Sequence, residues 1–133
     1  MRRVFADTFY FLAVLNRGDP AREQALRYYG DPTVLIVTTE WVLVEVGDAM
    51  AVPPARQKFK ELTELLKAEE QISVLPATHE LFERGAALYF QRADKKWSLT
   101  DCISFVVMTE EGITDALTGD HHFEQAGFRA LLK

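Results

Sequence analysis

The chain has a single cysteine, Cys102, which excludes an internal disulfide and a metal site built from thiolates. It also lacks any apolar run near the roughly 20 residues that a membrane-spanning helix needs. Residues 1–7 lead directly into strand-like sequence, without the apolar core and cleavage site of a secretory signal. These absences favour a protein of the reducing cytoplasm.

An excess of positive charge is missing as well. The 133 residues include 15 lysines and arginines against 20 aspartates and glutamates, for a formal net charge of −5. Bulk electrostatics therefore do not indicate nucleic-acid binding, and any contact with phosphates depends on where individual charges lie. The sequence has no repeat, low-complexity tract or linker, and its 48% hydrophobic content is ordinary for a globular protein. We expect one domain over residues 1–133.

Short apolar segments alternate with segments of helical periodicity along the chain. The expected strands cover residues 4–6, 34–37, 72–75, 113–117 and 128–132. The expected helices cover residues 9–15, 20–29, 41–50, 55–69, 79–89 and 99–111. This alternation predicts an α/β fold in which a small, mostly parallel sheet lies between helices, as a three-layer α/β/α sandwich.

Helix-start and helix-stop residues support these boundaries. Ser98 is a good N-cap, and Asp101 lies three residues on, where a carboxylate can accept from the amides of the first turn. Gly112 is placed to end that helix. Asp19 is expected to cap the helix of residues 20–29 with Pro20 as its first residue, where the missing N–H of proline costs nothing.

Four acids are expected to meet at one edge of the predicted sheet. Asp7 and Asp120 follow strands, Glu45 lies in the helix after the second strand, and Asp101 begins the helix that leads to the fourth. Functional groups of parallel sheets gather beyond the carboxyl ends of the strands. Clustered carboxylates resist ionising together, and a divalent cation removes that cost. Oxygen ligands of this kind suit Mg²⁺ or Mn²⁺, which activates water for phosphodiester hydrolysis.

Four segments of the chain, taken in order, resemble the motifs of the PIN-domain nucleases, and most closely those of the VapC-type toxins of toxin–antitoxin modules. The segments are residues 4–8, 42–46, 97–105 and 116–123. The most specific part is a Ser-x-x-Asp element followed, about one helix later, by Thr-x-Asp-x-x-Phe. The resemblance implies a PIN-like α/β/α fold and a metal-dependent endoribonuclease acting on tRNA, rRNA or mRNA. It also implies a cognate antitoxin and a homodimer.

The same resemblance assigns roles to individual residues. It implies that four acids are catalytic and bind Mg²⁺ or Mn²⁺: Asp7, Glu45, Asp101 and Asp120. It also implies that three hydroxyl residues support this site: Thr8 supports the first acid, Ser98 supports the third, and Thr118 is the other.

Three of the four acids also have a simpler structural explanation. Asp7 would serve as a helix cap, Asp101 as half of a capping box, and Glu45 as part of a solvated helix stripe. Asp115 is an alternative ligand to Asp120. We expect Asp120 to be the essential one, because Asp115 lies at the start of the strand and farther from the site.

The other polar candidates are expected to contact RNA. His121 and His122 are expected in a loop, as RNA contacts rather than general bases, because a metal-activated water needs no histidine. The charged loop residues proposed to contact the RNA backbone are Arg17, Lys95 and Lys96. Cys102 is expected to be a small buried residue rather than a nucleophile.

Two other functions remain open from the sequence. A signalling receiver, phosphorylated on an aspartate, needs a central strand that ends in that residue, whereas the second and third predicted strands end near Thr38 and Pro76. A catalytically silent PIN-like module would bind RNA or protein without cutting, and the presence of all four acids argues against it.

Overall fold

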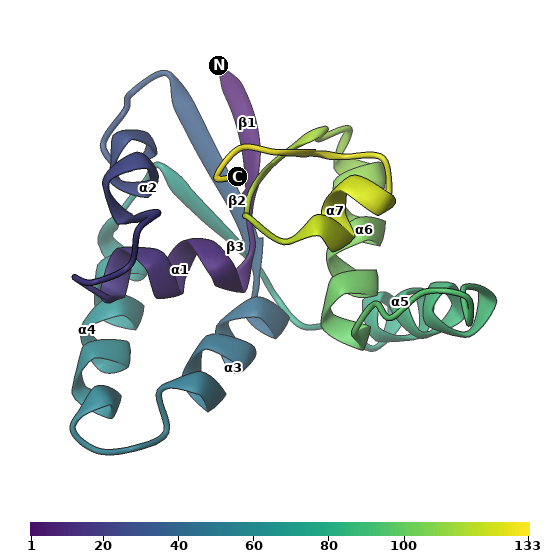
Figure 1. Ribbon diagram of the computed structural model, residues 1–133, viewed down its shortest axis with the longest axis horizontal. Coiled ribbons are helices and arrows are strands. Elements are labelled where there is room, and N and C mark those ends of the chain that lie inside the picture. Colours follow the sequence, from purple (N-terminus) through teal and green to yellow (C-terminus); the bar gives the residue numbers. More distant parts are fainter.

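Five parallel strands and seven helices make up the computed structural model, which describes residues 1–133 (Figure 1). The strands are β1 (Arg2–Ala6), β2 (Val34–Thr39), β3 (Ile72–Leu75), β4 (Asp115–Leu117) and β5 (Arg129–Ala130). The helices are α1 (Thr8–Leu15), α2 (Arg22–Tyr28), α3 (Glu40–Ala49), α4 (Ala55–Ala68), α5 (His79–Gln91), α6 (Leu99–Glu111) and α7 (His121–Gln125). None of the helices is long and apolar enough to cross a membrane.

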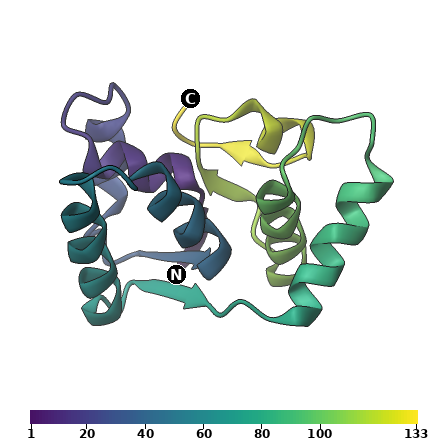
Figure 2. The ribbon, with the colours of Figure 1, turned by 90° about the horizontal axis from the view of Figure 1, so that it is seen from below.

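The strands lie side by side in the order β3-β2-β1-β4-β5, and every pairing is parallel. Helices α1, α2 and α4 lie on one side of the sheet and α5, α6 and α7 on the other (Figures 1 and 2). Helix α3 follows the carboxyl end of β2 and contacts both α1 and α6. The predicted three-layer α/β/α sandwich is therefore confirmed.

The core lies where the central strands meet these helix layers. Val4, Phe5 and Ala6 of β1 are fully buried, as expected for a strand covered on both faces. Trp97, Phe105 and other apolar residues fill the layer of α6, and one continuous cluster joins both sides of the sheet. This packing fixes the carboxyl edge of the sheet, where the acids lie.

The predicted ends of α6 are confirmed. Ser98 Oγ accepts from the backbone N–H of Asp101 at 3.0 Å, and Asp101 Oδ2 accepts from the backbone N–H of Ser98 at 3.1 Å. Gly112 ends the helix in the left-handed conformation, with φ of +68°, which glycine adopts without a steric penalty. Asp101 is thus held at a defined point of the first turn.

Two predicted boundaries are wrong. Helix α2 begins at Arg22 rather than at Pro20, and residues 20 and 21 form a turn before it. The Asp19 carboxylate still accepts from the N–H of Ala21 at 2.8 Å, the contact typical of a cap. His121 and His122, expected in a loop, instead begin helix α7, whose N-cap is Asp120. The predicted strands of residues 113–117 and 128–132 are present but shorter, as β4 and β5.

Candidate metal centre

Asp7 lies at the carboxyl end of β1, next to the carboxyl end of β4. Ala6 of β1 pairs with Leu117 of β4, so the residues that follow, Asp7 and Thr118, are neighbours across the sheet. Thr118 Oγ1 donates to Asp7 Oδ2 at 2.9 Å, and both side chains are buried. The chain runs from β1 to β2 on one side and returns to β4 on the other. This is a topological switch point, where ligands of open α/β sheets bind.

Glu45 reaches the same edge from α3. Helix α3 starts at the end of β2, and the hydroxyl of Thr39 caps it by accepting from the N–H of Val42 at 3.2 Å. The next contact joins α1 to α3: Thr8 Oγ1 donates to Glu45 Oε1 at 2.5 Å. The predicted support of the first acid by the Thr8 hydroxyl is therefore corrected, since that hydroxyl orients the second acid.

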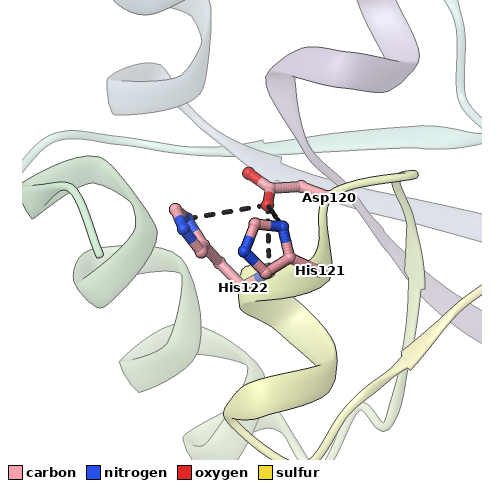
Figure 3. Close-up of side chains that lie close together, drawn as sticks. All are labelled: Asp120, His121 and His122. Carbon is pink, nitrogen blue, oxygen red and sulfur yellow. Dashed lines mark hydrogen bonds and ion pairs between the residues drawn. The ribbon is translucent and has the colours of Figure 1, made fainter. Parts of the chain in front are cut away.

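Asp120 and the two histidines after it join Asp101 at this edge. Thr118 Oγ1 accepts from the backbone N–H of Asp120, and Asp120 Oδ1 caps α7 by accepting from the N–H of His122 at 2.9 Å. His122 Nδ1 lies 3.0 Å from Asp101 Oδ2 and 3.6 Å from Asp120 Oδ1. Figure 3 shows the rings of His121 and His122 next to each other, both facing the Asp120 carboxylate.

The turn that carries Asp120 packs closely on α1. A Cβ atom added at Gly119 would lie 2.6 Å from the ring of Phe9. A side chain at this position would force the Phe9 ring to shift, whereas glycine lets the turn lie directly against it. The approach brings Asp120 towards the start of α1, where Asp7 is the N-cap.

Two acids at this edge, Asp7 and Asp101, are harder to ionise than free carboxyl groups. Burial, together with the charges of Asp101 and Glu45, raises the pKa of Asp7 to about 7, although the hydrogen bond from Thr118 lowers it. Burial also raises the pKa of Asp101, with a smaller contribution from the charge of Asp120, against the hydrogen bonds from the Ser98 amide and from His122. The couplings link all four acids in one cluster.

No lysine or arginine neutralises this cluster. The ion pairs that lysines and arginines form in the structure all involve other acids. Asp115 is the contrast, because Arg2 and Arg129 bind its carboxylate at 2.8 and 2.9 Å at the opposite end of β4. As predicted, Asp115 lies farther from the site than Asp120.

A divalent cation fits the cluster on the chemistry of its donors. Four carboxylates converge, two of them nearly inaccessible to solvent, with exposed fractions of 5% for Asp7 and 7% for Asp101. Anionic oxygens without cationic partners are the ligand set of hard divalent cations. A divalent ion bound here would compensate the buried negative charge of the carboxylates.

The predicted RNA contacts are not all near the acids. Lys95 and Lys96 line a cleft of about 380 Å³ that extends to Cys102, the neighbour of Asp101. Arg17 is exposed beyond the last residue of α1. The helix between it and Asp7 is roughly 12 Å long. Among the histidines, His121 is largely exposed, whereas His122 is turned inward to Asp101.

The sequence did not predict the contact of His122 with Asp101, because His122 was expected in a loop. The signal that would have found it is Asp120, which is a good N-cap for a short helix. Cys102 is fully buried, as predicted, and burial with the charge of Asp101 raises the pKa of its thiol to about 11. A nucleophilic thiolate at this position is therefore not supported.

Comparison with known proteins agrees with this geometry. The PIN domain family matches residues 4–129. The 23S rRNA-specific endonuclease VapC20 of Mycobacterium tuberculosis is 27% identical, over 94% of this chain and 95% of that protein, in each of the strains CDC 1551 and H37Rv.

The same relative has a solved structure. The crystal structure of M. tuberculosis VapC20, described as a sarcin–ricin loop cleaving toxin, superposes with a TM-score of 0.83 at 25% identity, covering 94% of this chain and 95% of that one. The predicted resemblance to PIN-domain nucleases and VapC-type toxins is confirmed, as is the predicted endoribonuclease function. The chain belongs to the PIN domain family.

Proposed function

We propose that this chain is a Mg²⁺- or Mn²⁺-dependent ribonuclease toxin that cuts 23S rRNA at a centre formed by Asp7, Glu45, Asp101 and Asp120. The observation that carries the proposal is the convergence of four acids, without a lysine or arginine partner, at the switch point of the sheet. The named substrate of VapC20, which this chain matches over nearly its whole length, supports rRNA as the target.

The chain's own residues hold this centre in shape. Thr118 fixes one oxygen of Asp7, and Thr8 fixes one oxygen of Glu45. The amide of Ser98 fixes one oxygen of Asp101. Each carboxylate would still have lone pairs to offer to a cation, which when bound would supply an activated water and stabilise charge that develops on the phosphate.

The partners of the protein follow from the same proposal. Lys95 and Lys96 are placed beside the start of α6, where they would contact the RNA backbone on its way to Asp101. A toxin of this kind requires a cognate antitoxin in the cell, and we expect the protein to act in the cytoplasm as a homodimer. Growth of cells expressing the chain with and without the neighbouring upstream reading frame tests the antitoxin.

The direct test is cleavage of intact ribosomes by the purified chain. We expect cleavage of 23S rRNA in the presence of Mg²⁺ or Mn²⁺ and none in chelator. Asp101→Asn should reduce the rate at least about a hundredfold, because the lost carboxylate binds the cation. Asparagine still accepts from the amide of Ser98, so the capping box and the fold should persist, which circular dichroism checks.

Asp115→Asn is the matched control, because it removes the same charge from the other end of β4. It should cleave at nearly the wild-type rate at a temperature where both proteins are folded. A folded wild type that leaves ribosomal RNA intact with either metal would overturn the rRNA target. If it also cut no tRNA or mRNA, the chain would be a silent binding module.

A further inference from the structure

His122 provides a nitrogen atom at the acidic cluster that a purely oxygen-ligated centre does not need. Its Nδ1 lies 3.0 Å from Asp101 Oδ2 and 3.6 Å from Asp120 Oδ1, between two of the proposed acids. The side chain is only 20% exposed, so its orientation is set by packing and by these contacts rather than by solvent. An imidazole in this position either orients Asp101 or binds the cation.

The spacing of the atoms matches ligands of one ion. An ion with ligands at about 2.1 Å places neighbouring ligand atoms roughly 3.0 to 3.4 Å apart. The nitrogen–oxygen distances of His122 agree with this range to within a few tenths of an ångström. The ligand atoms of Asp120, His121 and His122 also all lie within 4.8 Å of one another.

We propose that His122 Nδ1 is a ligand of the cation, together with Asp101 and Asp120, and that this mixed nitrogen–oxygen centre selects Mn²⁺ over Mg²⁺. Imidazole nitrogen suits transition metals, whereas Mg²⁺ is held almost entirely by oxygen. The inference rests on the proposed function, since it concerns the same site, and it replaces the sequence-based expectation that His122 contacts RNA.

The two histidines differ in their expected contribution. His121 Nδ1 also lies 3.6 Å from Asp120 Oδ1, but 64% of its side chain is exposed. His122 contacts two acids and His121 only one. The nitrogen that determines selectivity is therefore that of His122.

Binding measurements on the metal-free protein test the proposal without RNA. The Kd of Mn²⁺ and of Mg²⁺ would be measured by calorimetry for wild type and His122→Gln. Glutamine keeps a donor near Asp101 but is a poor ligand. We expect the Kd of Mn²⁺ to rise at least about tenfold and that of Mg²⁺ to change by less than about threefold. Equal changes for both metals would overturn the proposal.

Spectroscopy gives a second readout. Pulsed electron paramagnetic resonance of bound Mn²⁺ should show coupling to a directly bound ¹⁴N nucleus in the wild type, and His122→Gln should remove it. The chain has three histidines, so the source of the signal can be assigned. His121→Gln and His79→Gln are the controls and should keep the signal. His79 is exposed on α5, where it pairs with Glu83.

The outcomes separate this inference from the proposed function. Mn²⁺ bound without nitrogen coupling, in a protein that cleaves RNA, would show that His122 only orients Asp101 and would overturn the inference alone. Nitrogen coupling that depends on His122, in a protein that cleaves no RNA, would support the inference and overturn the nuclease proposal.

Discussion

Asp7 shows how one residue's surroundings can work against its own charge. It is buried at the end of β1, and its nearest charged neighbours in the cluster, Asp101 and Glu45, are also acids. Burial and this repulsion raise its pKa to about 7, so the folded protein without metal holds a proton there that the unfolded chain releases near pH 4. Such an acid lowers stability at neutral pH, a cost typical of functional sites.

The pH dependence of stability follows from this shift. Below about pH 4, Asp7 is protonated in both states and contributes nothing. As pH rises to about 7, unfolding releases its proton, so the free energy of unfolding of the metal-free protein falls. Asp7→Asn should be as stable as wild type at pH 4 and more stable at pH 8, by as much as about 4 kcal/mol. Denaturant unfolding in chelator measures both.

Asp115→Asn is the control with the opposite sign. Burial raises the pKa of Asp115, but the hydrogen bonds from Arg129 and Arg2 outweigh it, so the net pKa is lowered. Its removal should therefore lower stability at pH 8. An Asp7→Asn protein that is less stable than wild type at pH 8 would contradict the clustered acids.

The sequence predicted these residues unevenly. Asp7 and Asp120 follow strand ends and Asp101 lies in the first turn of a helix, so capping rules and the parallel topology predict where these three lie. Glu45 lies in the middle of α3 and was predicted from its apolar sequence neighbours and the motif resemblance. The partners of the acids were harder to predict, because they depend on register between distant segments. Thr118 reaches Asp7 through the pairing of β1 with β4, and Thr8 reaches Glu45 across two helices.

At the scale of elements, the packing of α5 on α6 helps to position Asp101, which lies in the first turn of α6. Gly85 of α5 is buried, and a Cβ atom added there would lie 2.2 Å from Cγ1 of Ile103 and 3.1 Å from its Cα. The second distance involves the backbone of α6, which cannot move away as a side-chain tip can. Glycine is therefore used for close helix approach, although it weakens a helix.

Gly85→Ala tests this packing. In an exposed helix the change would stabilise the protein by up to about 1 kcal/mol. Here overpacking should reverse the sign and destabilise by roughly 1–3 kcal/mol, measured by denaturant unfolding. Ile103→Ala should reduce that cost in a double-mutant cycle, because it removes the atom at 2.2 Å. A Gly85→Ala protein as stable as wild type would contradict the close approach.

Element boundaries were predicted well where a cap or glycine marks them and poorly where a turn competes. Helix α6 begins and ends as its Ser98 and Gly112 indicate. The start of α2 was misplaced by two residues, because Pro20 and Ala21 form a turn before the regular helix begins. Helix α7 has only five residues, too few for helical periodicity to be visible.

On the scale of the whole molecule, the centre connects the two halves of the chain. Asp7 and Glu45 come from elements before β3, and Asp101 and Asp120 from elements after it. The helices of the first half and those of the second lie on either side of the sheet in Figure 2. Without metal, the hydrogen bond from Thr118 to Asp7 is one link between the halves at this edge, and the repulsion among the acids acts against it.

A bound cation should therefore stabilise the whole molecule rather than one loop. At a concentration of about 100 times its Kd, Mn²⁺ should add about 2.7 kcal/mol at pH 8, a rise of about 10 °C in Tm. The rise should be smaller at pH 5, where Asp7 holds its proton. Asp120→Asn should lose most of it and Asp115→Asn should keep it. Hydrogen exchange should slow on both sides of the sheet, at the starts of α1 and α6, and protection confined to residues near α7 would show that the ion binds only the second half of the chain.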